Sequence, residues 1–127
     1  MLPSQLVAEV EALRAEEFDI ELVEAEGWAL LVLHQYMLPS GYAQIATDLL
    51  LKFPLAYPNG QPDMFWVEEA VALVSNAVPR NADSVEVVLG RRWRRFSWHT
   101  QAWNPGVDCL RTYLGFVDAG LTKAKAA

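Results

Sequence analysis

Hydrophobic and polar residues recur with two different periods along the chain, and each period predicts a type of element. Near the N-terminus the apolar residues lie three or four positions apart, at Leu6, Val7, Val10 and Leu13. This spacing places them on one face of an amphipathic helix, which we expect to begin with Ser4 as its N-cap and to end near Glu16. Beyond that helix the period falls to two, which is typical of strands.

Four strand-like segments follow the predicted helix. Residues 18–22 alternate apolar and acidic side chains, as expected of a half-buried strand, whereas residues 28–33 are almost continuously apolar and predict a central strand. Residues 47–53 and 64–67 complete the series. Because turns such as that at Gly27 join these segments, we expect a four-stranded antiparallel meander.

Irregular segments lie between and after these strands. Proline or glycine occupies four positions within nine residues, at Pro54, Pro58, Gly60 and Pro62. Because proline cannot donate to a strand ladder and glycine relaxes the backbone, we expect an extended, turning segment there. After the fourth strand, residues 71–74 are expected to form a short strand or a turn, and a polar loop follows at residues 79–83. Residues 85–89 are expected to form another strand or a strand-like approach to the Trp93 region.

Residues 91–121 carry most of the distinctive chemistry of the chain. This segment contains four clustered arginines, three of the five tryptophans, His99 and the only cysteine, Cys109. The Asn104-Pro105 pair predicts a helix start, because the asparagine side chain caps free N–H groups and proline suits the first turn. Apolar residues then recur at helical spacing, at Leu110, Tyr113, Leu114, Val117 and Leu121. We expect Gly120 to end this helix, which places Cys109 in its first turns and His99 in a loop or short strand ahead of it.

The composition narrows the class of protein. A chain of 127 residues is long enough for one domain with a single core, residues 1–127, and the order of elements makes the predicted fold α+β. No apolar run approaches the ~20 residues that span a bilayer, and no signal peptide is apparent, so we expect no membrane association. A lone cysteine rules out an internal disulfide and suits the reducing cytoplasm. The net charge of −6 makes nucleic acid an unexpected partner.

The charged residues are unevenly distributed. Residues 1–26 carry eight acidic residues against one base, Arg14, whereas Arg91, Arg92, Arg94 and Arg95 form a basic cluster. Either these patches are solvated or paired with each other, or one of them docks a protein partner. In the second case the charges mainly set the association rate and the choice of partner.

The proline-rich segment resembles that of a known family. Residues 52–65, KFPLAYPNGQPDMF, are similar to the F-P-x-x-Y-P-x-x-x-P segment of ubiquitin-conjugating enzymes, in which such a loop joins the third and fourth strands. Trp103-Asn104-Pro105 resembles the W-x-P that opens the helix after their active-site loop. The WRRFSWH stretch followed by W-x-P-G-x-D resembles a divergent bacterial branch, found in ubiquitin-like conjugation operons. The likeness covers residues 4–121 and implies a UBC-like fold with truncated C-terminal helices, because only eighteen residues follow Cys109.

The resemblance also implies a catalytic cysteine. Typical members of the family carry a His-Pro-Asn tripeptide, with the thioester cysteine about ten residues beyond the histidine. His99-Thr100-Gln101 precedes Cys109 by that spacing. This alignment makes Cys109 the thiol and Gln101 the counterpart of the asparagine, whose amide donates to an oxyanion. Counting back about eight residues from the W-x-P instead places Arg95 at the cysteine position and Val85 at the histidine position. The first alignment keeps a cysteine at the thioester position, and the second keeps the family's spacing to the helix that begins at the W-x-P.

The role of each candidate residue has an alternative. Cys109 is a thioester site, favoured by the positive end of a helix, or a buried structural thiol. His99 acts as a base or orients the loop, or it only satisfies a loop carbonyl, and Gln101 is otherwise a plain loop residue. His34, inside an apolar strand, is expected at a strand edge or as a satisfied core residue. The sequence has no Cys/His cluster with ligand spacing and no glycine-rich phosphate loop, so we expect no metal and no cofactor.

The resemblance implies two modes of function, and the lone thiol permits a third. In the first mode the chain is a transferase that accepts a ubiquitin-like modifier from an activating enzyme as a thioester and passes it to a target. In the second it is a non-catalytic adaptor that binds the modifier or the activating enzyme. The third is a small Cys/His hydrolase. We favour the transferase, whose partners are the activating enzyme and the ubiquitin-like modifier.

Overall fold

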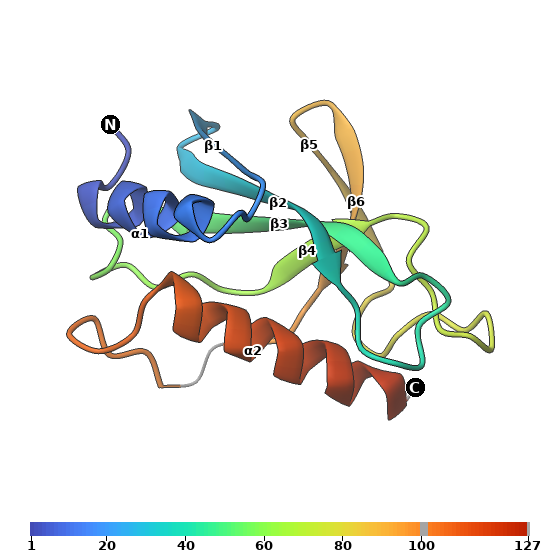
Figure 1. Cartoon of the computed structure of the whole chain (residues 1–127). Coiled ribbons are helices and arrows are strands. Elements are labelled where there is room, and N and C mark those ends of the chain that lie inside the picture. Colours follow the sequence, from blue (N-terminus) through green and yellow to red (C-terminus); the bar gives the residue numbers. More distant parts are fainter. Residues whose placement is uncertain (100–101, 127) are drawn as a thin grey trace.

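An antiparallel sheet with two helices against one of its faces forms the architecture of the computed structural model (Figure 1). The structure describes residues 1–99 and 102–126. Apolar side chains from both helices and from one face of the sheet share a single buried core. The expected α+β fold is therefore confirmed.

Helix α1, Ser4–Ala15, lies where the apolar spacing predicts it and buries Leu6, Val10 and Leu13. The expected N-cap is wrong, because Ser4 is already helical and Pro3 precedes the first turn without a side-chain cap. Pro3 has φ −60° and ψ 127°, and its carbonyl accepts a hydrogen bond from the Val7 N–H at 3.1 Å. The fixed φ of proline thus starts the helical ladder without a polar cap.

The predicted meander is present and extends further than expected. Its strands are β1 (Ile20–Ala25), β2 (Trp28–Met37), β3 (Ala46–Pro54) and β4 (Phe65–Glu68), each antiparallel to the next. A hairpin of β5 (Ser84–Val88) and β6 (Arg91–Phe96) adds two strands, so that the sheet order is β1-β2-β3-β4-β6-β5. Residues 71–74 form no strand of their own, and Leu73 makes only an isolated bridge to Tyr42.

The sheet is apolar on both faces. The face toward the helices contributes to the main core, while a second cluster lies on the opposite face, which we call the outer face. This second cluster consists of Leu30, Val32, Leu50, Trp66, Val88 and Trp93. The last two residues belong to the β5–β6 hairpin, so the hairpin packs into this second cluster. Strand β2 is therefore buried on both sides, which explains its continuous apolar run.

Helix α2, Leu110–Lys123, begins later and ends later than expected. The Asn104-Pro105 pair starts a turn instead, because the Asn104 side chain accepts from the Gly106 N–H at 3.0 Å and the Asn104 carbonyl accepts from the Asp108 N–H at 2.7 Å. Gly120 does not end the helix but is buried within it, and a short 3₁₀ turn, η1 (Ala124–Ala126), follows.

The proline-rich segment between β3 and β4, residues 55–64, forms a crossover that packs against the C-terminal part of the chain. The Trp103 indole N–H donates to the Pro58 carbonyl at 2.8 Å, and the Tyr113 hydroxyl donates to the Met64 carbonyl at 2.5 Å. The Tyr57 ring is buried and lies 5.9 Å from the Trp103 ring. These contacts fix the start of α2 against the crossover.

Candidate functional site

Cys109 is the N-cap residue of α2 and is partly exposed rather than sealed in the core. Its side chain accepts the backbone N–H of Thr112, and the Cys109 N–H donates to the Thr112 hydroxyl at 2.9 Å. This reciprocal arrangement is a capping box in which the sulfur replaces the usual hydroxyl. The expectation that Cys109 lies near the positive end of a helix is therefore confirmed, although the helix starts immediately after it.

A pocket of about 100 Å³ opens beside the thiol, between α1 and the start of α2. Its lining comprises Glu9, Ala12, Leu13, Cys109, Leu110 and Arg111. Ala12 and Leu13 give the pocket apolar walls, and Arg111 is held at its rim by Glu16 at 2.5 Å. The thiol thus adjoins open space that a reacting group can enter.

Glu9 dominates the polar contacts at the start of α2. Its Oε1 accepts from the Leu110 N–H at 3.1 Å and from the Tyr57 hydroxyl at 2.6 Å. Burial, and then this hydrogen bond to Glu9, raise the pKa of Tyr57, so the phenol stays protonated. Cys109 therefore lies next to both the N–H groups at the start of α2 and the carboxylate of Glu9.

His99 lies in the loop after β6, as expected, and its side chain is 58% exposed. Its Nδ1 is 2.8 Å from Oδ2 of Asp63 in the crossover. Among the residues that the structure describes, no hydrogen bond or ion pair joins His99 to Cys109. Gln101, the third predicted site residue, lies outside the described residues.

The alternative alignment of the W-x-P places an arginine where the family has its thiol. Arg95 lies within β6 and donates to Glu86 of the neighbouring strand at 2.5 Å. Its Nε also donates to the Ser97 hydroxyl at 3.1 Å. A paired strand residue of this kind offers no nucleophile, so Cys109 is the only thiol that either alignment can use.

A larger groove, of about 280 Å³, lies on the outer face and was not predicted. Its lining comprises Trp28, Lys52, Gln61, Asp63, Met64, Trp66 and Glu86. The Lys52 ammonium stands 4.7 Å from the Trp66 ring centroid, and the Trp66 indole N–H donates to Glu86 at 3.0 Å. Strand alternation could have placed Lys52 and Trp66 on one face, but the pairing of β3 with β4 is needed to bring them together.

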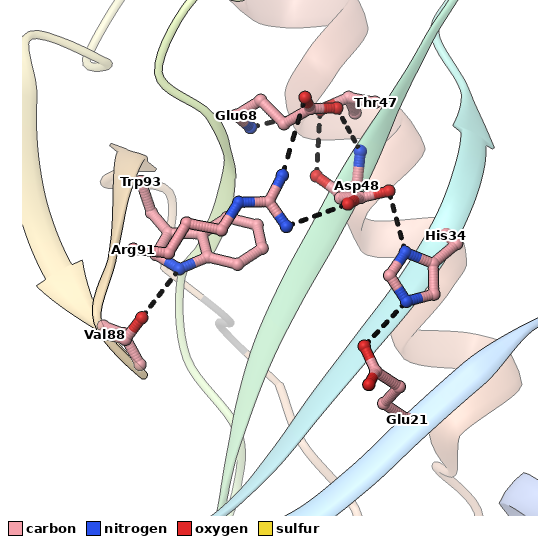
Figure 2. Close-up of polar contacts among 8 residues, drawn as sticks. All are labelled: Glu21, His34, Thr47, Asp48, Glu68, Val88, Arg91 and Trp93. Atoms are coloured by element: carbon pink, nitrogen blue, oxygen red, sulfur yellow. Dashed lines mark hydrogen bonds and ion pairs between the residues drawn. The ribbon is translucent and has the colours of Figure 1, made fainter.

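A chain of alternating charges occupies another part of the outer face (Figure 2). His34 lies between Glu21 and Asp48, with nitrogen–oxygen distances of 2.7 and 3.0 Å. Arg91 continues the chain to Asp48 at 2.9 Å and to Glu68 at 3.5 Å. His34 was expected at a strand edge or in the core, whereas it stands on the sheet face beside an irregularity between Leu33 and Tyr36.

These contacts shift the pKa values of His34 and Asp48. Hydrogen bonds to Asp48 and then to Glu21 raise the pKa of His34, against the smaller opposing effect of burial. Burial tends to raise the pKa of Asp48, but the hydrogen bonds from Arg91 and His34 prevail and lower it.

Within residues 1–99 and 102–126, no group of three or more His, Cys, Asp or Glu residues is arranged to hold a metal ion. No helix in that part of the chain is long and apolar enough to cross a bilayer.

Comparison with known proteins identifies one family. A search of curated proteins finds no match, and a search of solved structures finds none either. The family model described as Prokaryotic E2 family E matches residues 6–124, which is nearly the whole chain. The resemblance drawn from the crossover and the W-x-P is thereby confirmed. With its N-terminal helix, antiparallel sheet and C-terminal helix, the chain belongs to the prokaryotic E2 family.

Proposed function

We propose that this chain accepts a ubiquitin-like modifier from an activating enzyme as a thioester on Cys109 and passes it to an amine of a target. Membership of the prokaryotic E2 family supports this class of reaction. The observation that carries the assignment to this residue is the partly exposed thiol at the start of α2, beside an open pocket.

The chemistry requires two acyl transfers. In the first, the Cys109 sulfur attacks the carbonyl carbon of the modifier's thioester with the activating enzyme. A new carbon–sulfur bond forms, the old one breaks, and the leaving thiol takes up the proton that Cys109 loses. In the second, a target amine attacks the same carbon and the amide bond forms. The carbon–sulfur bond to Cys109 breaks, and the sulfur takes up the proton that the amine loses, which regenerates the thiol. The N–H groups at the start of α2 favour the anionic sulfur in both steps.

In this proposal His99, in the loop after β6, and Gln101, two residues further along the chain, assist the acyl transfers. The contact with Asp63 orients the His99 ring and lets its second nitrogen face an incoming partner. Gln101 would supply its amide N–H₂ to the oxyanion that forms at the thioester carbon. Both roles require the modifier's C-terminus to lie between this loop and the thiol.

A second candidate function is a non-catalytic adaptor that binds the modifier or the activating enzyme. Two observations favour it. The Cys109 sulfur already accepts a capping hydrogen bond, and the Glu9 carboxylate holds the adjacent N–H of Leu110. The carboxylate opposes a thiolate beside it, and a sulfur engaged in the cap has to give up this hydrogen bond before it attacks.

A loading experiment separates the two functions. The protein is incubated with its activating enzyme, the modifier and ATP, and the products are run on non-reducing gels. A transferase forms an adduct that thiol reductant removes and that is absent in Cys109→Ala. Cys109→Ser preserves a capping oxygen and should form an adduct that resists reductant but not mild base. If no adduct forms while a stable complex with the modifier or activating enzyme persists, the adaptor function is correct. His99→Gln serves to test the loop, and it should slow loading without abolishing it.

A further inference from the structure

His34 stands on the outer face of β2 with a carboxylate against each of its ring nitrogens (Figure 2). Nε2 lies 2.7 Å from Oε2 of Glu21 on β1, and Nδ1 lies 3.0 Å from Oδ1 of Asp48 on β3. A neutral imidazole has one N–H donor and one acceptor nitrogen, whereas the imidazolium has two donors. Since ionised carboxylates only accept, both contacts can be hydrogen bonds only when His34 carries its second proton.

We propose that His34 is a proton-dependent clamp that ties the edge strand β1 across β2 to β3 and that releases β1 when the imidazolium loses a proton. Strand β1 is the first strand in the sheet order and has β2 as its only strand neighbour among the described residues. A side-chain link from Glu21 on β1 to His34 on β2 therefore adds to the single backbone ladder that holds this edge.

The two carboxylates are held unequally, and this decides which contact opens. The other oxygen of Asp48 accepts from Arg91 at 2.9 Å, and the Asp48 side chain is only 17% exposed. The Glu21 side chain is 68% exposed. A neutral His34 therefore keeps its remaining N–H on Nδ1, toward Asp48, and turns the lone pair of Nε2 toward Glu21. Two acceptors then face each other at the β1 contact, and Glu21 moves into solvent.

The charged groups around the His34 ring either favour its protonated form or are already paired with one another. Asp19, whose carbonyl accepts the His34 backbone N–H at 2.9 Å, adds a further negative charge on the β1 side. Glu68 on β4 is 3.5 Å from Arg91, and Arg91 in turn holds Asp48. The hydrogen bonds to Asp48 and Glu21 raise the pKa of His34 above its ordinary 6.5.

The sign of the pH dependence follows from this raised pKa. The folded pKa is higher than the unfolded pKa, so the clamp contributes its full stability at pH values below the unfolded pKa of 6.5. This contribution is lost as the pH rises through the raised folded pKa. Arg14 of α1 donates to the Ile20 carbonyl at 2.6 Å, so the start of β1 keeps a side-chain contact that does not involve His34.

The chain contains two histidines, which makes the test direct. The ring signals of His34 and His99 are followed by NMR across the pH range and assigned with His34→Gln. In parallel, hydrogen exchange of the β1 amides is measured at about pH 6 and about pH 9 and converted to protection factors, to remove the intrinsic pH dependence of exchange. In the wild type we expect His34 to titrate above its ordinary value and the protection of β1 to fall on the order of tenfold between the two pH values.

The variants give the matched controls. His34→Gln should show low β1 protection at both pH values, and His99→Gln should retain the wild-type pH response. Glu21→Gln, at an exposed side chain, should lower the pKa of His34 and reduce the change in β1 protection between the two pH values. This variant replaces His34→Gln in the comparison if His34→Gln does not fold. A His34 signal that titrates at its ordinary value would overturn the proposal. So would β1 protection that is equal at both pH values.

Discussion

The two glycines of α2 should respond in opposite directions to the same substitution. Gly120 is buried, and a Cβ added there would lie 2.9 Å from Cε1 and 3.1 Å from Cζ of Phe65. Gly115 is exposed on the same helix, and a Cβ added there would meet nothing within 4 Å. We therefore expect Gly115→Ala to stabilise the protein and Gly120→Ala to destabilise it.

The magnitude depends on whether the Phe65 ring can move. Phe65 is fully buried and is stacked on Phe96 with ring centroids 4.8 Å apart, so its ring has little free space behind it. Overpacking of this kind costs about 1–3 kcal/mol. Replacing glycine by alanine within a helix contributes about 1 kcal/mol of stability in the opposite direction. The net change should be a loss of about 1 kcal/mol for Gly120→Ala and a gain of about 1 kcal/mol for Gly115→Ala.

Urea denaturation of the two variants and the wild type measures both changes on one scale. The double variant Gly120→Ala/Phe65→Leu tests the cause, because a smaller side chain at position 65 removes the overlap. The loss of unfolding free energy caused by Gly120→Ala should then be smaller in the Phe65→Leu background than in the wild type. Equal stabilisation by both alanines would refute this account of Gly120, as would a cost that is unchanged in the Phe65→Leu background.

Two further substitutions test the contacts that hold the start of α2. Glu9→Ala leaves the Tyr57 hydroxyl and the first N–H of the helix without their acceptor and should cost about 2 kcal/mol in urea denaturation, whereas Glu9→Gln keeps an acceptor oxygen and should cost less. Because Glu9→Gln also removes the negative charge beside Cys109, it should accelerate alkylation of the thiol, and Glu11→Gln on the same helix should not. Trp103→Phe removes the indole N–H that bonds the crossover carbonyl and should lower the free energy of unfolding by about 1 kcal/mol; an unchanged unfolding midpoint would show that this bond contributes nothing.

The elements that the sequence predicts well are those whose patterns are set locally. Helix α1 and strands β1 to β4 each carry a local pattern of apolar residues, which is periodic in α1 and continuous in much of β2, and the crossover follows from the chemistry of proline. Strand β6 was missed because its pattern, RRWRRF, buries only Trp93 and Phe96 and presents arginines between them. Arg92 pairs with Glu69, which follows β4, and Arg95 pairs with Glu86 on β5, so the strand pattern is visible only when those neighbours are known.

The boundaries of α2 show the same limit. Asn104 and Pro105 have the residue types of a helix start, but the Asn104 side chain bonds the N–H of Gly106 and forms a turn. Gly120 has the residue type of a helix end, yet a residue without Cβ is needed there because Phe65 approaches the helix closely. In both cases the residue type is compatible with two local structures, and tertiary packing selects the one that the sequence did not predict.

The candidate site depends still more on contacts distant in sequence. Spacing along the chain suggested a group of His99, Gln101 and Cys109, but in the fold His99 contacts Asp63 in the crossover. The surroundings of the thiol come instead from α1, through Glu9, which is 101 residues away from the Leu110 N–H that it accepts. No periodicity or motif in α1 distinguishes Glu9 from the other acidic residues of the N-terminal region.

This arrangement links the stability of the fold to the reactivity of the sulfur. The carboxylate of Glu9 joins α1, Tyr57 of the crossover and the first N–H of α2, so it stabilises the junction of three segments. The same carboxylate competes with the sulfur for the positive end of α2. A partner that draws the Glu9 carboxylate away would therefore loosen the junction and favour the thiolate at once.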